Sequence, residues 1–186
     1  MALTKIDEHT ALVVIDLQKG IVAMPTKPYS TADVVERATR IARAFRESGL
    51  PVVLVNVNGM APGRTDARRI NASFPQDWAE IIPELKEYAD HFVTKQRPGA
   101  FLGTGLDEYL HENNVTQIVL TGVSSSNGVE STARSAYDLG YNVTIVADAI
   151  SDRDADTHQY SVEKIFPRLS EVTTTYEILK LLITGK

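Results

Sequence analysis

The sequence feature that most constrains the fold is a set of short apolar runs, rich in Val and Ile, that do not alternate with polar residues. The clearest of them cover residues 11–15, 52–55, 118–120 and 143–146. Strands buried on both faces of a parallel sheet have this pattern, whereas a strand with one solvated face alternates. Two weaker runs, at 91–94 and 171–174, raise the number of predicted strands to six.

Segments with helical spacing lie between the predicted strands. In the first of them, apolar residues recur at intervals of three and four from Val34 to Phe45, and Gly49 followed by Pro51 is typical of a helix end. Four more helices are predicted at 104–113, 127–139, 154–166 and 174–183, with Asn127 as the N-cap of the second segment in this list. Because strands and helices alternate, we predict an α/β fold, a three-layer doubly wound sandwich with right-handed crossovers. A length of 186 residues fits a single domain that spans 1–186.

Composition excludes several classes of function. The chain has 19 Lys and Arg residues and 24 Asp and Glu residues, which gives a net charge of −5. The basic residues are too scattered to form the positive surface of a nucleic-acid-binding protein. The longest apolar runs have about five residues, whereas a membrane-spanning helix needs about 20, and the N-terminus has no hydrophobic segment of signal-peptide length. We therefore expect a cytoplasmic protein that binds neither nucleic acid nor membrane. The absence of Cys excludes disulfides, thiolate metal sites and a Cys nucleophile.

Polar residues at the ends of the predicted strands are candidates for a functional site, because ligands of open α/β sheets bind at the carboxyl ends of the strands. The candidates found in this way are Asp16, Asn56, Asn58, Lys95, Arg97 and the segment 121–128. The segment 56–78 has little periodicity and several Gly and Pro residues, which predicts a long loop. A loop of this length in a compact domain is usually functional or mobile.

Asp16 and Lys95 are candidates for a charged pair. Asp16 ends an apolar strand, where a carboxylate is costly to desolvate unless a cation or hydrogen-bond donors hold it. Taken alone, Asp16 also fits a structural carboxylate that caps a turn, and Lys95 also fits a solvated surface lysine. If the two side chains meet, an attraction of about 4 kcal/mol at about 4 Å, for an effective dielectric of about 20, favours the ionised carboxylate before desolvation is subtracted.

The segment 121–134 runs from a strand end into a helix N-terminus. Backbone N–H groups point outward at such a terminus and the helix dipole favours negative charge, so the segment could form an anion or oxyanion site. A Ser- and Asn-rich turn whose side chains only cap the helix explains the same residues.

Three motifs together resemble the isochorismatase-like (cysteine hydrolase) superfamily. They are Asp-Leu-Gln at 16–18, Thr-Lys-Gln-Arg-Pro-Gly-Ala-Phe at 94–101, and Thr-Gly-Val at 121–123 before Ser-Thr-Ala-Arg at 131–134. The resemblance covers nearly the whole chain and implies a six-stranded parallel sheet of order 3-2-1-4-5-6. It matches Asp16 and Lys95 to the catalytic Asp and Lys of the amidase members, whose nucleophilic Cys falls here on Gly128. It also implies a cis peptide bond between Val123 and Ser124, with the backbone N–H groups of Ser124 and Gly128 aimed into the pocket.

The missing Cys has two interpretations. In the isochorismatase branch of the superfamily the Cys is also absent and often replaced by Gly, because vinyl-ether hydrolysis needs a proton donor rather than a nucleophile. Asp16 would then protonate the substrate while Lys95 holds it; since an ion-paired Asp is a poor acid, its pKa would rise only when substrate closes the site. The predicted function is a cysteine-independent small-molecule hydrolase that acts on a vinyl ether or an amide-type substrate. The alternative is an inactive binding or regulatory protein that retains the pocket.

Further residues are expected to bind a small-molecule substrate. The candidates are Gln18, Asn56, Arg97, Phe101 and Asn127, with Arg64 as a second cation for an anionic substrate. The chain has Ser-Ser-Ser-Asn at 124–127, where isochorismatases typically carry a Tyr-Ala-His-type stretch.

Other chemistries have less support in the sequence. A serine nucleophile among 124–126 needs a positioned base, and none of the four His residues lies in the motifs, His158 being expected in a late helix. Nicotinamidases of the superfamily bind a divalent metal through an Asp-x-His pair after the second strand, where this chain offers only the amides of Asn56 and Asn58, so no metal is predicted. The glycines of 99–105 lack the spacing of a phosphate-binding loop, and no cofactor is expected. A homo-oligomer is expected because such sandwiches often associate.

Overall fold

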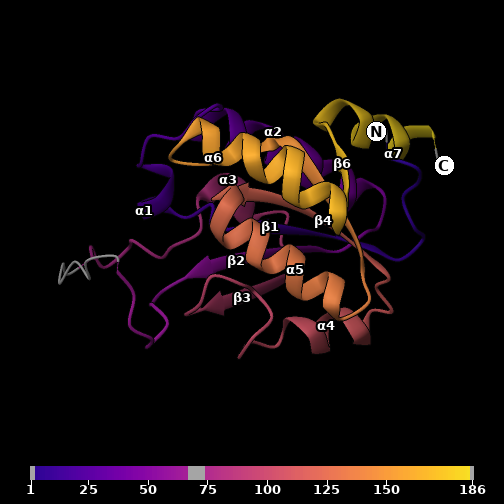
Figure 1. The fold of residues 1–186 in the computed structure, drawn as a ribbon. Helices are drawn as coiled ribbons and strands as arrows, with labels where there is room; N and C mark the ends of the chain where they lie inside the picture. The colour runs from indigo at the N-terminus through magenta and orange to yellow at the C-terminus, as the bar shows by residue number, and fades with distance from the viewer. Residues whose placement is uncertain (1–2, 67–73, 185–186) are drawn as a thin grey trace.

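The computed structural model describes residues 3–66 and 74–184 of the chain. Its centre is one parallel sheet formed by β1 (Thr10–Ile15), β2 (Val52–Val57), β3 (His91–Lys95), β4 (Gln117–Val123), β5 (Asn142–Ser151) and β6 (Glu171–Thr173). The strand order is β3-β2-β1-β4-β5-β6 (Figure 1). The six predicted strands and their order are confirmed. Every residue of the central strands β1 and β4 is buried, as the unbroken apolar runs predict.

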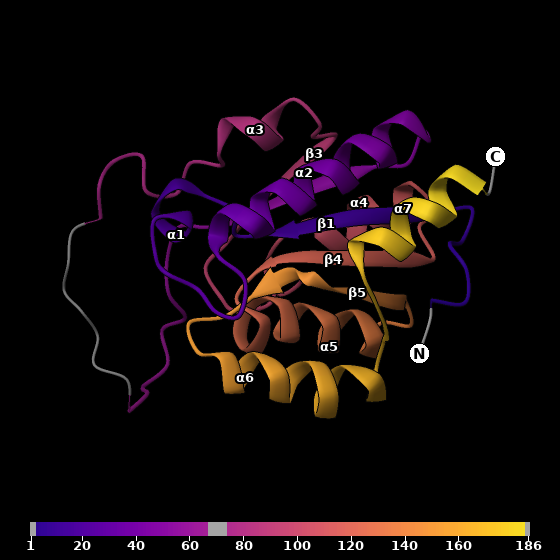
Figure 2. The same cartoon turned by 90° about the horizontal axis from the view of Figure 1, so that it is seen from above.

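Helices cover both faces of the sheet and give the predicted three layers (Figure 2). One face carries α2 (Thr31–Glu47), α3 (Pro83–Lys86) and α7 (Thr175–Thr184), and the other carries α4 (Leu106–Glu112), α5 (Glu130–Asp138) and α6 (Ala155–Tyr160). The five predicted helices are confirmed. Helix α3 and the short α1 (Lys19–Val22) have one turn each, too few residues for their spacing to show in the sequence. None of the helices in the described parts of the chain is long and apolar enough to cross a lipid bilayer.

Helix α2 follows the predicted apolar spacing. The side chains that it buries are those of Val34, Ala38, Ile41, Ala42 and Phe45. The helix begins with a capping box, in which the Ser30 side chain accepts from the backbone N–H of Asp33 and the Asp33 carboxylate accepts from the backbone N–H of Ser30. After the helix, Gly49 has a φ of 71°, which turns the chain back toward β2.

The helix predicted from Asn127 begins earlier than expected. The chain leaves β4 and forms the π-helical turn η1 (Ser125–Val129), which continues into α5. Asn127 therefore lies inside the helical segment, and its prediction as the N-cap is wrong. The physical reason is that Ser124 has the extended backbone of a capping residue. The carboxylate of Glu130 is held by Arg134 and Ser161.

The helix predicted at 154–166 also continues past its expected end. Helix α6 passes into the turns η2 (Ser161–Ile165) and η3 (Phe166–Arg168). Pro167 lies in the first turn of η3, where its missing N–H has no bond to lose.

The described part of the long predicted loop lies at the carboxyl edge of the sheet (Figure 2). Neither 58–66 nor 74–82 contains a helix or strand element, and 67–73 lies outside the described residues. The returning chain is fastened to α1, because the backbone N–H of Lys19 donates to the carbonyl of Glu80 and that of Gly20 donates to the carbonyl of Trp78. The Trp78 indole lies directly on Gly20, at the place that a Cβ would occupy.

Candidate active site

A buried ion pair joins Asp16 and Lys95 at the carboxyl edge of the sheet. The Nζ atom of Lys95 donates a hydrogen bond to Oδ2 of Asp16 over 2.8 Å, and the two side chains are 2% and 8% exposed. Asp16 follows β1 and Lys95 ends β3, with β2 between them. Because neighbouring strands are about 4.8 Å apart, the pair must bridge about 10 Å of sheet, which needs a side chain as long as that of Lys.

The backbone at Asp16 turns sharply off the end of β1. Its φ of 54° lies in the left-handed region, which non-glycine residues seldom adopt. The backbone N–H of Asp16 donates to the carbonyl of Val55, and its own carbonyl accepts from the N–H of Gln18. Such conformations cost about 1–3 kcal/mol and cluster at functional sites. Here the turn leaves the carboxylate between Lys95 and Gly128.

The acidity of Asp16 differs from the sequence-based expectation. Burial raises the pKa of Asp16 to about 6, although the charge and the hydrogen bond of Lys95 act in the opposite direction. The other carboxylate oxygen, Oδ1, is buried with no hydrogen-bond partner among the described residues. The raised pKa differs from the expectation that Lys95 keeps Asp16 a poor acid until substrate arrives, because burial has the larger effect on Asp16 in the resting protein. A carboxyl group with this pKa can give and take a proton near neutral pH.

Gly128 lies directly against the Asp16 carboxylate. A Cβ atom at residue 128 would be 3.3 Å from Oδ2 of Asp16 and 2.9 Å from Cγ2 of Ile15. The position matched to the family's Cys therefore does face Asp16, and the backbone of Gly128 packs so closely there that a Cβ atom would not fit unless Ile15 moved. A second glycine, Gly122, is needed for packing, because its φ is +115° and a Cβ there would be 2.0 Å from the carbonyl oxygen of Ile15.

We expect Gly128→Ala to lower both stability and activity. The added methyl must displace Ile15 or the η1 turn, an overpacking cost of about 1–3 kcal/mol. That cost exceeds the gain of at most about 1 kcal/mol from replacing a helical glycine by alanine. Urea unfolding measures the change in the free energy of unfolding. Gly105→Ala is the matched control, because a Cβ at residue 105 meets no atom within 4 Å. Equal stability of the two variants would show that the space at residue 128 is not tight.

The turn after β4 begins with the peptide bond between Val123 and Ser124, which is cis, as the resemblance implies. The Ser124 carbonyl accepts hydrogen bonds from the N–H groups of Asn127 and Val129, at 3.2 and 3.1 Å. These bonds close the η1 turn around Gly128. The role of the Ser124 and Gly128 N–H groups as oxyanion donors stays a prediction.

Gln18 and Asn56 are engaged with the backbone of the long loop. The side-chain amide of Gln18 donates to the carbonyls of Val57 and Trp78, and its oxygen accepts from the Val57 N–H. The amide of Asn56 donates to the carbonyl of Ala79 and accepts from the Thr94 hydroxyl. In this structure the two side chains hold the loop to the sheet. Their predicted contacts with substrate would require those bonds to exchange.

The remaining predicted binding residues are dispersed. Phe101 belongs to the apolar core, with its ring 5.9 Å from that of Tyr141, which precedes β5. The guanidinium of half-buried Arg97 lies over Gly103, with Nη1 2.9 Å from where a Cβ would be. Arg64 and Asn127 are exposed. The structure thus brings together Asp16, Lys95 and Gly128, and places Phe101 in the core.

The structure also joins two residues that the motifs did not connect. His158 on α6 lies 2.8 Å from the Ser125 hydroxyl, measured to Nδ1. The sequence offered no signal for this contact, because 33 residues and the whole of β5 separate the two positions. His158 lies in a late helix, as expected, and the fold brings it to the serine-rich turn although it belongs to none of the motifs.

Metal ligands do not gather in the described part of the chain, where no three His, Asp or Glu side chains are placed to share an ion. The residues after β2 are Asn56 and Asn58, whose neutral amides are poor ligands for zinc. The prediction that the protein needs no metal rests on these donors.

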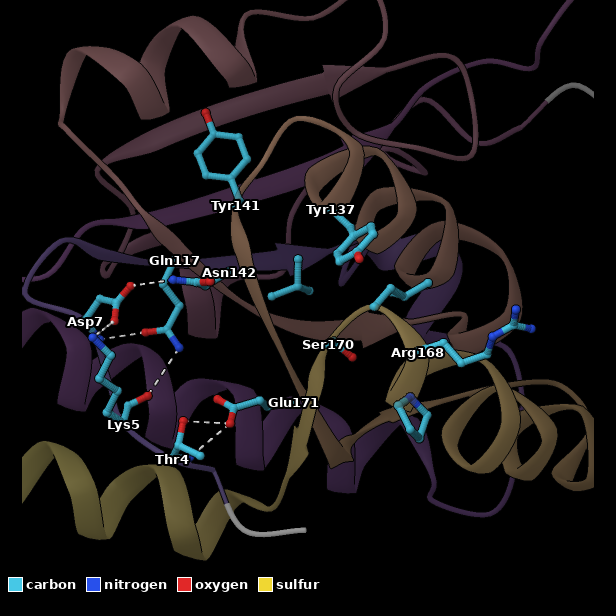
Figure 3. Close-up of a pocket in the computed structure, with 13 residues that line it drawn as sticks. Thr4, Lys5, Asp7, Gln117, Tyr137, Tyr141, Asn142, Arg168, Ser170 and Glu171 are labelled. Carbon is cyan, nitrogen blue, oxygen red and sulfur yellow. Dashed lines mark hydrogen bonds and ion pairs between the residues drawn. The ribbon is translucent and has the colours of Figure 1, made fainter.

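The pocket in Figure 3 lies at the opposite, amino-terminal edge of the sheet. It has a volume of about 420 Å³. Its polar side chains bond to one another or to nearby backbone: Glu171 accepts from Thr4, Lys5 pairs with Asp7, and Gln117 accepts from the Asp7 N–H. Since these groups are already satisfied and lie far along the strands from Asp16, the carboxyl edge remains the better candidate for the site.

Comparison with known proteins identifies the family. The Isochorismatase domain matches residues 10–177 of the chain. The chain belongs to the isochorismatase family. It is 40% identical over 180 residues to the uncharacterized isochorismatase family protein YecD of Escherichia coli O157:H7, covering 93% of this chain and 96% of YecD. It is 38% identical over 182 residues to the uncharacterized isochorismatase family protein YwoC of Bacillus subtilis (strain 168), covering 93% of this chain and 94% of YwoC.

Solved structures of the isochorismatase family share the fold. An isochorismatase family protein from Burkholderia thailandensis superposes with a TM-score of 0.91 at 38% identity, covering 96% of this chain and 98% of that chain. The isochorismatase fold accounts for the six-stranded sheet and its order. Membership of the isochorismatase family supports a hydrolase.

Proposed function

We propose that this isochorismatase family protein is a small-molecule hydrolase that uses Asp16, in place of a Cys, as its acid and base. One observation carries the proposal: Asp16 is buried beside Lys95 and the bare Gly128, with its pKa raised to about 6. The chain contains no Cys, so the thiol route of the amidase members is closed to it. A proton donor without a nucleophile favours a vinyl ether over an amide as the substrate, because the hydrolysis of a vinyl ether starts with protonation of a carbon atom.

The proposed reaction begins with protonated Asp16. The carboxyl gives its proton to the terminal alkene carbon of the vinyl ether, which becomes an oxocarbenium ion, and Lys95 stabilises the carboxylate that remains. Water then adds its oxygen to the cationic carbon and returns a proton to Asp16. The hemiketal so formed collapses to a ketone or aldehyde and an alcohol. Asp16 therefore acts first as general acid and then as general base, and ends in its starting state.

The pH dependence of turnover follows from the raised pKa of Asp16. Because the acid form of Asp16 starts the reaction, we expect kcat to fall about tenfold per pH unit above about pH 6. An Asp with the ordinary pKa of 3.8 would place this fall near pH 3.8. Initial rates measured in buffers of constant ionic strength give the profile. A kcat that rises through this range would assign Asp16 the role of a base only.

The substrate class is tested with matched pairs of compounds. Each vinyl ether in the panel is offered beside its saturated ether and beside an amide of similar size, and products are followed by NMR. We expect the vinyl ethers alone to be cleaved. Cleavage confined to the amides would overturn the proposed chemistry. A compound that binds and stays intact over long incubation, with no other turnover, would instead support an inactive binding protein.

A further inference from the structure

A second polar cluster lies on the side of the η1 turn that faces α6. The Ser125 hydroxyl and Nδ1 of His158 are 2.8 Å apart, and the two residues are 0% and 6% exposed. Ser125 is the first residue of η1, and Gly128 belongs to the same turn. The proposed reaction uses neither Ser125 nor His158. Their hydrogen bond joins α6 to the turn that carries Gly128.

The burial of Ser125 determines the direction of this bond. The Ser125 hydroxyl has His158 as its one hydrogen-bond partner in the part of the chain that the structure describes. A buried hydroxyl proton needs an acceptor, so Ser125 donates to Nδ1 and the neutral ring carries its proton on Nε2. A protonated ring has no acceptor nitrogen. The bond would then run from Nδ1–H to Oγ, and the Ser125 proton would lose its partner.

The groups nearest His158 favour the neutral ring. Tyr29, in the loop before α2, presents its ring edge-on with the two centroids 6.0 Å apart. Burial holds the pKa of His158 below its usual range, and the charge of Asp152, which follows β5, opposes that shift only in part. The Asp152 carboxylate accepts two hydrogen bonds of 2.8 Å from Ser126, one from the backbone N–H and one from the hydroxyl.

Two further carboxylates close to α6 have hydrogen-bond partners of their own. On α5, Glu130 accepts from Arg134 and from the Ser161 hydroxyl. At the start of α6, Asp154 accepts from the backbone N–H and the hydroxyl of Thr157. The backbone of Lys27 pairs with that of Asp152, which brings the lysine close to this cluster. The protonation state of His158 therefore sets the direction of its bond to Ser125.

We propose that Ser125 and His158 are positioning residues for the Asp16 site. The bond between them holds the η1 turn so that Gly128 stays against Asp16, and protonation of His158 reverses the bond and displaces the turn. This inference rests on the proposed function for its effect on turnover. It adds to that function a loss of activity at low pH. The group that causes this loss, His158, lies on the side of the turn away from the reacting groups.

The first test compares substitutions that keep or remove the acceptor at Nδ1. His158→Asn keeps an acceptor at that place without a titration, whereas His158→Ala and Ser125→Ala remove the bond. We expect the two alanine variants to lower kcat about 10-fold to 100-fold with little change in KM, as for a small displacement of an aligned site. Ser125→Thr keeps a hydroxyl at this position and should therefore keep most of the wild-type kcat. Ser126→Ala is the matched control, because Ser126 keeps its backbone bond to Asp152.

The pH profile separates positioning from general loss of structure. We expect the wild-type protein to lose kcat at low pH as His158 becomes protonated, and His158→Asn to lack this acid limb. His111→Asn, which changes an exposed His, should keep it. An acid limb that persists in His158→Asn, or equal losses of kcat in Ser125→Ala and Ser126→Ala, would overturn the inference.

A measurement without substrate keeps the inference separate from the proposed function. In an Asp16→Asn background, which removes the titration of Asp16, the backbone amide resonance of Gly128 is followed by NMR against pH. We expect it to shift with the same midpoint as the His158 ring, and to lose that transition when His158→Asn is added. If this coupling is present but no compound is turned over, the proposed function fails and the positioning role stands. If the Gly128 resonance does not shift with the protonation of His158, the positioning role fails, whatever the protein hydrolyses.

Discussion

Asp16→Asn is expected to lower kcat by about 10²-fold to 10⁴-fold, the range that a positioned proton donor contributes. The amide has nearly the shape of the carboxyl, and its oxygen can still accept from Lys95, so the substituted site keeps its packing. An amide cannot give a proton to carbon near neutral pH, because it has no acidic proton at that pH. The loss should therefore appear in kcat, with KM almost unchanged.

The control for Asp16→Asn is a substitution that also removes one negative charge at the same edge of the sheet. Glu80 is exposed and pairs with Lys19 over 2.9 Å, so Glu80→Gln removes one carboxylate without touching the buried pair. We expect its kcat to stay within about twofold of the wild-type value, as for a surface ion pair. Equal rates for Asp16→Asn and the wild-type protein would remove Asp16 from the mechanism.

Lys95→Met is expected to cause the largest loss of stability, about 3–5 kcal/mol in the free energy of unfolding at about pH 8. The substitution keeps the length of the side chain and leaves the Asp16 carboxylate buried without its cation. With Lys95 absent, burial alone acts on Asp16 and raises its pKa further. A group whose pKa is raised in the folded state gains stability as pH falls, because the folded state then binds the proton more tightly. The deficit should accordingly shrink between about pH 8 and about pH 5.

A double variant separates the charge from the packing. Asp16→Asn with Lys95→Met removes both charges, so it should be more stable than Lys95→Met alone by more than the error of urea unfolding. Lys19→Met is the comparison at an exposed ion pair, since the Lys19 side chain is 41% exposed. This substitution should lower the free energy of unfolding by at most about 1 kcal/mol. A Lys95→Met protein as stable as Lys19→Met would mean that Asp16 is already neutral at the higher pH.

The sequence was most informative where one physical cause dominates. Unbroken apolar runs identify the inner strands β1, β2, β4 and β5, because both faces of a parallel sheet must avoid water, and the two weaker runs correspond to the edge strands β3 and β6. The motifs located Asp16, Lys95 and Gly128, because these residues follow strands that end at one edge. The start of the helix predicted at 127–139 was misplaced, since Ser124 and Asn127 are both good caps and local propensity does not choose between them.

Site residues that depend on long-range contacts were harder to predict. Gln18 and Asn56 follow strands as binding residues do, yet their amides hold the loop around Trp78 and Ala79. A side-chain amide has the same chemistry toward a substrate and toward a backbone carbonyl, so its position alone does not separate the two roles. His158 was missed because its partner lies across β5, on another element.

The sequence by itself determined the order of strands and helices, the absence of a thiol and the presence of one carboxylate and one ammonium at strand ends. Those properties depend on residue type and spacing along the chain. Only the tertiary structure decided that Lys95 reaches across β2 to Asp16, that the burial of Asp16 outweighs that cation, and that Ser125 meets His158. The reason is that desolvation depends on every atom packed around a group, and segments far apart in the chain supply most of those atoms.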